Sequence, residues 1–352
     1  MIGKIAFAVP GKITNLTGGT IYDRRVMEEL SAQGFDIHLI ELPASFPAPS
    51  PEDMDRTFAR LAQVPPNVPL IVDGLAYGVL DTARLSKLPA ACVALLHHPL
   101  AEEGGLAEDR RAFLHQTETN NLALARHVIV TSPHTAELLC VHYGVDRQKI
   151  SVAIPGAERP KLAPAPIEPP LILAVGIQLP RKGHDILLNA LSQIRDLEWN
   201  AVIVGAALDD NFAAKLKALR TQKGLGERVT LAGRLERDQL DQHYAQASIF
   251  ALATRYEGYG IVFNEALVHG LPIVSCATGA VVDTVPEGAG LLVRPEAPDV
   301  FADALRTMLT DHQLRAVCSA MAKSAGDCLP SWSDTAATIA EALHTALERE
   351  MG

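Results

Sequence analysis

Two glutamates, Glu257 and Glu265, lie in a glycine-containing segment between two apolar runs. Glu257 precedes Gly258 and Gly260, which permit close backbone approach, and we expect a helix to begin near Gly260. Glu265 then falls in the second turn of that helix, so both carboxylates can point toward the pocket at the end of the preceding strand. The free N–H groups at the helix start form an anion site beside them. This combination suits a ligand that carries hydroxyls at one place and phosphate at another, such as a nucleotide sugar.

A second candidate segment follows the apolar run 171–176. It carries Arg181 and Lys182, and it leads through Gly183 into a predicted helix. Two cations and a helix N-terminus at a strand end are suited to hold a pyrophosphate. The segment therefore predicts a phosphate-binding site that could serve the same ligand as the glutamates.

Two further predicted strands end in candidate residues. Gly18 and Gly19 lie between the first apolar run and the first helix, in a spacing that matches neither a dinucleotide fingerprint nor a phosphate-binding P-loop. His97 and His98 follow the apolar run 91–96. We expect His98 to face the site and His97 to point into the domain.

The segment beginning at Glu257 reads EGYGIVFNEALVHGLPIV and resembles the signature of retaining glycosyltransferase family 4. The match extends over about twenty residues and includes the glycines. The resemblance implies that Glu257 binds hydroxyls of the donor sugar and that Glu265 binds the ribose of the nucleotide. It also implies that the backbone of Gly258, Tyr259 and Gly260 contacts the sugar or its phosphate.

The segment around Lys182 is similar to the same family, in which a lysine at this position binds the donor phosphate. Many members carry arginine directly after the preceding glycine, whereas this chain has Ile177 there. Arg181 is the residue that could compensate. A weaker phosphate site is the alternative.

The resemblance extends to the first half of the chain. It implies that Gly18 and Gly19 approach the donor phosphates, and that a histidine at the fourth strand end lies near the transferred sugar and the acceptor. His98 is our candidate for that histidine. Glu118, in a polar helix, is interpreted as a surface residue.

Short apolar runs alternate with longer amphipathic stretches, a pattern that predicts parallel strands joined by helices. A proline-rich segment at 155–170 separates two such series. We predict an N-terminal Rossmann-like acceptor-side domain over residues 1–158, a linker over 159–170, a C-terminal Rossmann-like donor domain over 171–330 and a final helix over 331–352. The family resemblance implies the GT-B fold, an α/β architecture with two doubly wound domains facing across a cleft and the last helix returning to the first domain.

Composition narrows the choice of partners and cofactors. The formal net charge of −10 argues against general binding to nucleic acid and against strong attraction to anionic lipid. The five cysteines are scattered without zinc-site spacing, and Asp209 and Asp210 lack the flanking pattern of a metal-binding Asp-x-Asp. We therefore expect a cytoplasmic protein with no metal or other cofactor, and peripheral membrane contact stays open.

These observations predict a retaining, metal-independent glycosyltransferase that moves a sugar from a nucleotide-diphosphate donor to an acceptor hydroxyl. The sequence does not identify the base, the sugar or the acceptor, which could be a lipid, a glycan or a small molecule. A sugar-nucleotide epimerase or hydrolase of the same fold is one alternative. A non-catalytic nucleotide-sugar-binding protein is another, and Ile177 favours it slightly.

Overall fold

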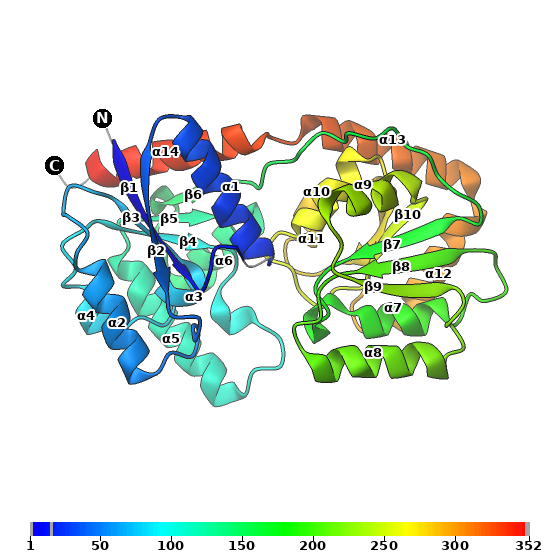
Figure 1. The fold of residues 1–352 in the computed structure, drawn as a ribbon, viewed down its shortest axis with the longest axis horizontal. Helices are drawn as coiled ribbons and strands as arrows, with labels where there is room; N and C mark the ends of the chain where they lie inside the picture. The colour runs from blue at the N-terminus through cyan, green and yellow to red at the C-terminus, as the bar shows by residue number, and fades with distance from the viewer. Residues whose placement is uncertain (1–2, 15–16, 349–352) are drawn as a thin grey trace. The chain divides into compact units, whose positions relative to one another are not determined.

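The computed structural model describes residues 3–14 and 17–348, which form two compact units (Figure 1). Unit 1 comprises residues 1–156 together with 330–352, and unit 2 comprises residues 157–329. Each unit contains one six-stranded sheet, and every strand pair is parallel.

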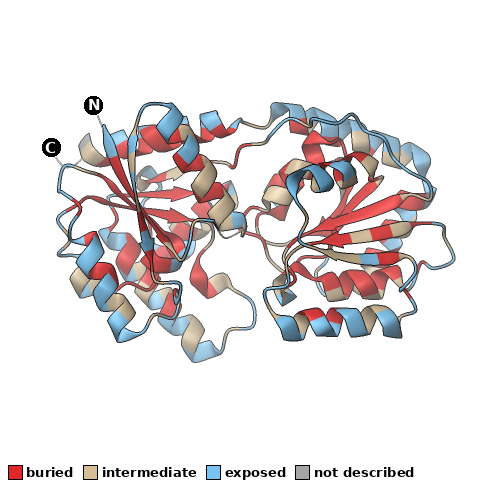
Figure 2. Ribbon diagram, in the orientation of Figure 1, coloured by how far each residue is buried: buried red, intermediate tan, exposed pale blue. Residues whose placement is uncertain are grey.

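The sheet of unit 1 has the strand order β2-β1-β3-β4-β5-β6. Its inner strands are buried at every position of β3, β4 and β5, because helices cover both faces (Figure 2). The strands are β1 (Lys4–Pro10), β2 (Asp36–Leu42), β3 (Leu70–Asp73), β4 (Cys92–Leu96), β5 (His127–Val130) and β6 (Ile150–Val152).

The C-terminal helix of the chain packs beside the first helix in unit 1 (Figure 1). The buried Tyr22 joins these parts, since its hydroxyl donates to the carbonyl oxygen of Ala153 at 2.8 Å and its ring meets that of Trp332 edge-on. The helices of unit 1 are α1 (Gly18–Ala32), α2 (Pro51–Leu61), α3 (Gly74–Tyr77), α4 (Thr82–Leu85), α5 (Glu108–Leu124), α6 (Pro133–Tyr143) and α14 (Trp332–Glu348), with 3-10 turns η1 (Leu100–Glu102) and η2 (Arg147–Lys149).

The sheet of unit 2 has the strand order β12-β11-β10-β7-β8-β9. The order reverses at β7, where a doubly wound sheet places its ligand crevice beyond the carboxyl ends of the strands. The strands are β7 (Leu171–Val175), β8 (Asn200–Val204), β9 (Val229–Gly233), β10 (Ile249–Leu252), β11 (Ile273–Cys276) and β12 (Gly290–Val293).

Two apolar clusters fill the two faces of this sheet. One contains side chains of α7, α8 and α12, and the other contains side chains of α9, α10, α11 and α13. The helices of unit 2 are α7 (His184–Leu191), α8 (Asp210–Gln222), α9 (Arg237–Gln246), α10 (Ile261–Val268), α11 (Val281–Thr284), α12 (Pro298–Thr310) and α13 (His312–Cys328), with the 3-10 turn η3 (Pro180–Lys182).

The proline-rich segment is bonded to unit 2. The backbone N–H of Ala165 donates to Ala245 at 2.7 Å, and that of Ile167 donates to Gln246 at 3.2 Å. Proline has no backbone N–H to donate, so residues such as Ala165 and Ile167 supply the hydrogen bonds that hold this segment on unit 2.

The predicted α/β fold with two doubly wound sheets is confirmed, and so is the return of the last helix to the first domain. The apolar runs identify the strands correctly because buried parallel strands have no polar face. Within residues 3–14 and 17–348, no helix combines the length and the apolar composition that a membrane crossing requires.

Gly156 provides a test of how α14 is held. A Cβ atom at this position would lie 2.3 Å from the backbone nitrogen of Trp332, so Gly156→Ala must displace the start of α14. We expect a loss of about 1–3 kcal/mol in the free energy of unfolding of unit 1, together with faster hydrogen exchange of α14 amides. Gly104→Ala is the matched control, because its Cβ would enter open space. Equal stability of the two variants would contradict this packing.

Candidate active site

Lys182 is placed by a close backbone approach between two loops of unit 2. Its neighbour Gly183 has φ 62°, and a Cβ there would lie 1.8 Å from the carbonyl oxygen of Ala253. Only glycine permits this approach. The loop after β7 therefore packs against the end of β10, and Lys182 is brought beside the loop that carries Glu257.

The carboxylate of Glu257 is the centre of a buried charged cluster. Lys182 Nζ lies 2.6 Å from its Oε1, and the Thr254 hydroxyl donates to the same oxygen at 3.1 Å. Arg181 lies 3.4 Å from Oε2. Burial alone raises the pKa of Glu257, but Lys182 and Arg181 outweigh it and hold the pKa below its ordinary value. The structure thus brings together three of the predicted site residues and keeps the glutamate ionised.

The loop of Glu257 is fixed from its other side. The carbonyl oxygen of Glu257 accepts a bond from the N–H of Ala280 at 2.9 Å. Gly279 has φ 52°, and a Cβ there would lie 2.3 Å from that carbonyl oxygen. A second glycine therefore permits a second close backbone contact, which limits how far the loop can move.

Helix α10 begins directly after Gly260, whose φ is 86°. Tyr259 is buried, and its hydroxyl bonds to Asn264 at 2.8 Å, so the side chain anchors the turn. No side chain in the part of the chain that the structure describes caps this helix start. The N–H of Phe263 donates to the carbonyl oxygen of Gly260 at 2.9 Å, and an anion site at the N–H groups before it stays a prediction. Gly258 is buried in the preceding turn.

Glu265 lies further along α10 in a separate polar group. Its Oε1 accepts from Arg237 at 2.6 Å, and its Oε2 accepts from the Tyr244 hydroxyl at 2.8 Å. The side chain keeps about a fifth of its surface exposed. Its partners come from α9, so the carboxylate is oriented by a neighbouring helix rather than by the cluster around Glu257.

In unit 1, Gly18 and Gly19 are the first two residues of α1 rather than part of the loop before it. Thr17 caps this helix by a reciprocal pair of bonds with Thr20. His98 lies after β4, and its Nε2 is 3.0 Å from a carboxylate oxygen of Glu103. The roles predicted for the two glycines and for His98 stay predictions.

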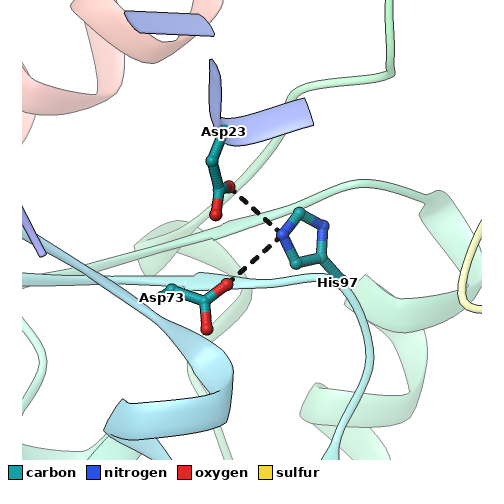
Figure 3. A group of neighbouring side chains, drawn as sticks. All are labelled: Asp23, Asp73 and His97. Atoms are coloured by element: carbon teal, nitrogen blue, oxygen red, sulfur yellow. Dashed lines mark hydrogen bonds and ion pairs between the residues drawn. The ribbon is translucent and has the colours of Figure 1, made fainter. Parts of the chain in front are cut away.

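Three other side chains of unit 1 converge at the carboxyl end of the sheet (Figure 3). His97 Nε2 lies 3.2 Å from an oxygen of Asp23 on α1 and 3.4 Å from an oxygen of Asp73 at the end of β3. Their ligand atoms lie within 4.8 Å of one another, so the set could hold a metal ion. Burial raises the pKa of Asp23 to about 7. Burial lowers that of His97, but the two carboxylates outweigh it and raise the pKa to about 10.

Comparison with known proteins shows which family model matches the residues of unit 2. The family model described as "Glycosyl transferases group 1" matches residues 158–325. Residues 158–325 belong to the group 1 glycosyltransferases. The match includes Lys182, Glu257 and Glu265, and the predicted family resemblance is thereby confirmed.

Relatives of the group 1 domain carry names of glycosyltransferases. D-inositol 3-phosphate glycosyltransferase of Xylanimonas cellulosilytica is 28% identical over 250 residues, which cover 66% of this chain and 60% of that protein. GDP-mannose-dependent alpha-(1-6)-phosphatidylinositol monomannoside mannosyltransferase of Mycobacterium tuberculosis is 32% identical over 186 residues, covering 50% of this chain and 48% of that protein. The chain thus spans less than two thirds of the length of these relatives.

Solved structures share the fold of the whole chain. Sucrose-phosphate synthase from Thermosynechococcus elongatus has a TM-score of 0.81 at 21% identity, covering 99% of both chains. Anabaena HepE, in complex with UDP and glucose, has a TM-score of 0.75 at 18% identity, covering 96% of this chain and 99% of that one. At this level of identity the likeness shows the fold alone, and the fold agrees with the group 1 assignment.

The sequence analysis missed several features of the site. The ring of His97 contacts Asp23 and Asp73 of its own unit, two partners that the sequence analysis does not predict. Asp73 could have been predicted as a partner of His97, because it ends the neighbouring strand and adjacent parallel strands end at the same edge of a sheet. The prediction that Glu118 lies on the surface is wrong. It is fully buried, and its carboxylate accepts the N–H of Leu100 at 3.0 Å, a contact that the polar helix pattern does not reveal.

Lys182→Ala tests the buried pair. Among the described residues, the change leaves Arg181 as the remaining charged partner of Glu257, and breaking a buried pair costs about 3–5 kcal/mol. Because the pKa of Glu257 is lowered from 4.5, its contribution to stability is present above pH 4.5 and is lost as the pH falls through the folded value. We therefore expect the stability gap between the wild type and the variant to be largest near neutral pH and to shrink on acidification.

Urea unfolding at neutral pH and at about pH 4 measures this gap. Lys217→Ala on α8 is the matched control, because Lys217 is exposed. A gap that does not depend on pH would mean that Lys182 stabilises unit 2 through packing alone.

Proposed function

We propose that this protein is a retaining, metal-independent glycosyltransferase that uses a nucleotide-diphosphate sugar as its donor. The observation that carries the proposal is the buried Lys182–Glu257 pair, at 2.6 Å, beside the open start of α10 in a group 1 domain. Unlike charges at a strand end, next to a helix start that no described side chain caps, fit a ligand with both phosphate and hydroxyl groups.

The donor would be held by three parts of unit 2. Lys182, Arg181 and the N–H groups at the start of α10 would bind the diphosphate. Glu257 would accept hydroxyl groups of the sugar through the carboxylate oxygen that Lys182 does not occupy. Glu265, already oriented by Arg237 and Tyr244, would bind the ribose.

The same positive groups would stabilise the departing nucleotide diphosphate, which a divalent cation does in metal-dependent enzymes. They are fixed before the reaction begins, because Lys182 is buried and paired. Removing one such preorganised donor costs about 3 kcal/mol, or about 10² in turnover. This is the physical basis for proposing a reaction that needs no metal and no other cofactor.

Retention at the anomeric carbon follows from the resemblance to family 4. We identify no carboxylate nucleophile among the described residues, so we propose a front-side path through an ion pair. The departing phosphate oxygen would take the proton of the acceptor hydroxyl. The acceptor would be a lipid, a glycan or a small molecule, and Gly18, Gly19 and His98 of unit 1 remain the predicted contacts to the donor phosphates and the reacting sugar.

A transfer assay with purified protein tests the proposal. UDP, GDP, dTDP and ADP sugars are supplied with an acceptor panel, first without and then with excess EDTA. We expect transfer from at least one donor, an unchanged rate with EDTA, and a rate about 10²-fold lower for Lys182→Ala. Complete loss with EDTA that Mg²⁺ or Mn²⁺ restores would contradict the metal-free mechanism.

The assay also separates the two alternatives. Conversion or hydrolysis of the donor in the absence of any acceptor would indicate an epimerase or hydrolase. Binding of a nucleotide sugar without transfer to any acceptor would indicate a binding protein. Lys217→Ala serves as the matched control for Lys182→Ala, since both remove one lysine from unit 2.

A further inference from the structure

We propose that Arg255 is a positioning residue of the donor site, which fixes the turn η3 and thereby sets where Lys182 lies. This role rests on the proposed function, because it takes Lys182 as a contact to the donor diphosphate. Arg255 lies two residues before Glu257, where its charge would also suit a direct contact to phosphate. The hydrogen bonds of its side chain decide between the two roles.

Arg255 bonds to the turn η3 through both its backbone and its side chain. Its backbone N–H donates to the carbonyl oxygen of Arg181 at 2.8 Å, and its Nη1 donates to that of Pro180. The hydroxyl of Thr254 donates to the same Arg181 oxygen at 3.0 Å. The loop after β10 therefore holds the first two carbonyl groups of η3, and Lys182 is the next residue along the turn.

The guanidinium of Arg255 is held in turn by two carboxylates. Asp185, in the first turn of α7, accepts from Nη1 at 3.0 Å and from Nη2 at 2.9 Å, which is the paired geometry that a guanidinium favours. Glu296, in the loop after β12, accepts from Nε and, at 3.4 Å, from Nη2. Arg255 thus connects the start of α7 with the loop between β12 and α12.

All five N–H groups of this guanidinium have an acceptor within unit 2. Nε–H donates to Glu296, Nη1 donates to Pro180 and Asp185, and Nη2 donates to Asp185 and Glu296. An arginine side chain has five such donors and no more. A direct contact to phosphate would require Arg255 to give up one of these bonds, whereas a role in holding η3 uses all of them.

Glu296 adopts a backbone conformation that is costly for a residue with a side chain. Its φ is 56°, and within residues 3–14 and 17–348 no other residue except glycine has a positive φ. Such a conformation persists where the surrounding contacts determine it, and it is most frequent at functional sites. The contact here is the bond to Arg255, so the strained residue places a second carboxylate on the guanidinium.

The side chain of Lys182 depends on the position of η3. Its stem lies against the end of β7, since a Cβ atom at Gly176 would be 3.2 Å from Cδ of Lys182, and its Nζ lies 2.6 Å from Oε1 of Glu257. The stem of lysine is flexible, so its ammonium group is placed accurately only if its backbone is fixed. A displacement of about 1 Å in a binding group can cost about 10² in rate, so Arg255 can affect the reaction without touching the donor.

Arg306 provides a matched control for a merely structural role. It makes a pair of the same kind with Asp196, at 2.6 and 2.8 Å, on the surface of unit 2. Its other described bond goes to Gln193, and neither partner is assigned to the donor site. If Arg255 only stabilised unit 2, Arg255→Gln and Arg306→Gln would have the same effects.

Urea unfolding tests the coupling between Arg255 and Lys182 without any ligand. The cost of Lys182→Ala is measured in the wild type, in Arg255→Gln and in Arg306→Gln. We expect Lys182→Ala to cost less stability in the Arg255→Gln background, because the pair with Glu257 is already weakened there. In the Arg306→Gln background it should cost as much as in the wild type. The same cost in all three backgrounds would overturn the proposal.

Calorimetric titration with UDP, GDP, dTDP and ADP gives the second readout. For a nucleotide that binds the wild type, we expect Arg255→Gln to weaken binding by about 10-fold or more. Arg255→Lys should weaken it nearly as much, because lysine keeps the charge but not the planar set of five donors. In the Lys182→Ala background, Arg255→Gln should weaken binding by less than about 2-fold. Arg306→Gln should bind like the wild type.

Two binding results would overturn the proposal. If Arg255→Lys binds as tightly as the wild type, Arg255 acts through its charge rather than through the bonds that hold η3. If Arg255→Gln weakens binding equally with and without Lys182, Arg255 does not act through Lys182. If none of the four nucleotides binds the wild type, the proposed function fails, and the unfolding comparison still decides whether Arg255 positions Lys182.

Discussion

The buried ion pair between Lys182 and Glu257 is the interaction on which the rest of unit 2 depends. Two charges removed from water are tolerated only with close partners, and here Thr254 and Arg181 supply them. The pair forms because Gly183 lets one loop lie against the backbone of another. Gly183 therefore determines where Lys182 lies, and Lys182 in turn keeps the carboxylate of Glu257 ionised.

Unit 1 contains a comparable cluster, in which two carboxyl groups surround one basic ring. There, the ring of His97 at the end of β4 contacts carboxyl groups from α1 and β3, and Gly19 lets the helix approach the ring. In both units the charged groups lie where the strands of a parallel sheet end, which is where such sheets bind ligands. The charges are fixed before any ligand arrives, so little reorganisation would be needed on binding.

Much of this could be predicted from the sequence. Continuous apolar runs identified the strands, and the spacing of glycines and glutamates around Glu257 identified the group 1 domain. The partners of each charged residue could not be predicted, because they come from distant segments. Arg237 orients Glu265 from another helix, and Asp23 reaches His97 from a helix whose polar positions look like an ordinary surface. The choice between His97 and His98 depended on side-chain direction at a strand end, where the alternation of the strand no longer applies.

The most direct measurement is a crystal structure of the protein with a bound nucleotide-diphosphate sugar. We expect one ligand whose diphosphate lies within hydrogen-bond distance of Lys182 Nζ and the first N–H groups of α10, with sugar hydroxyls on Glu257 and the ribose on Glu265. A ligand bound elsewhere, or one that reaches Glu265 while its diphosphate lies away from Lys182, would contradict it.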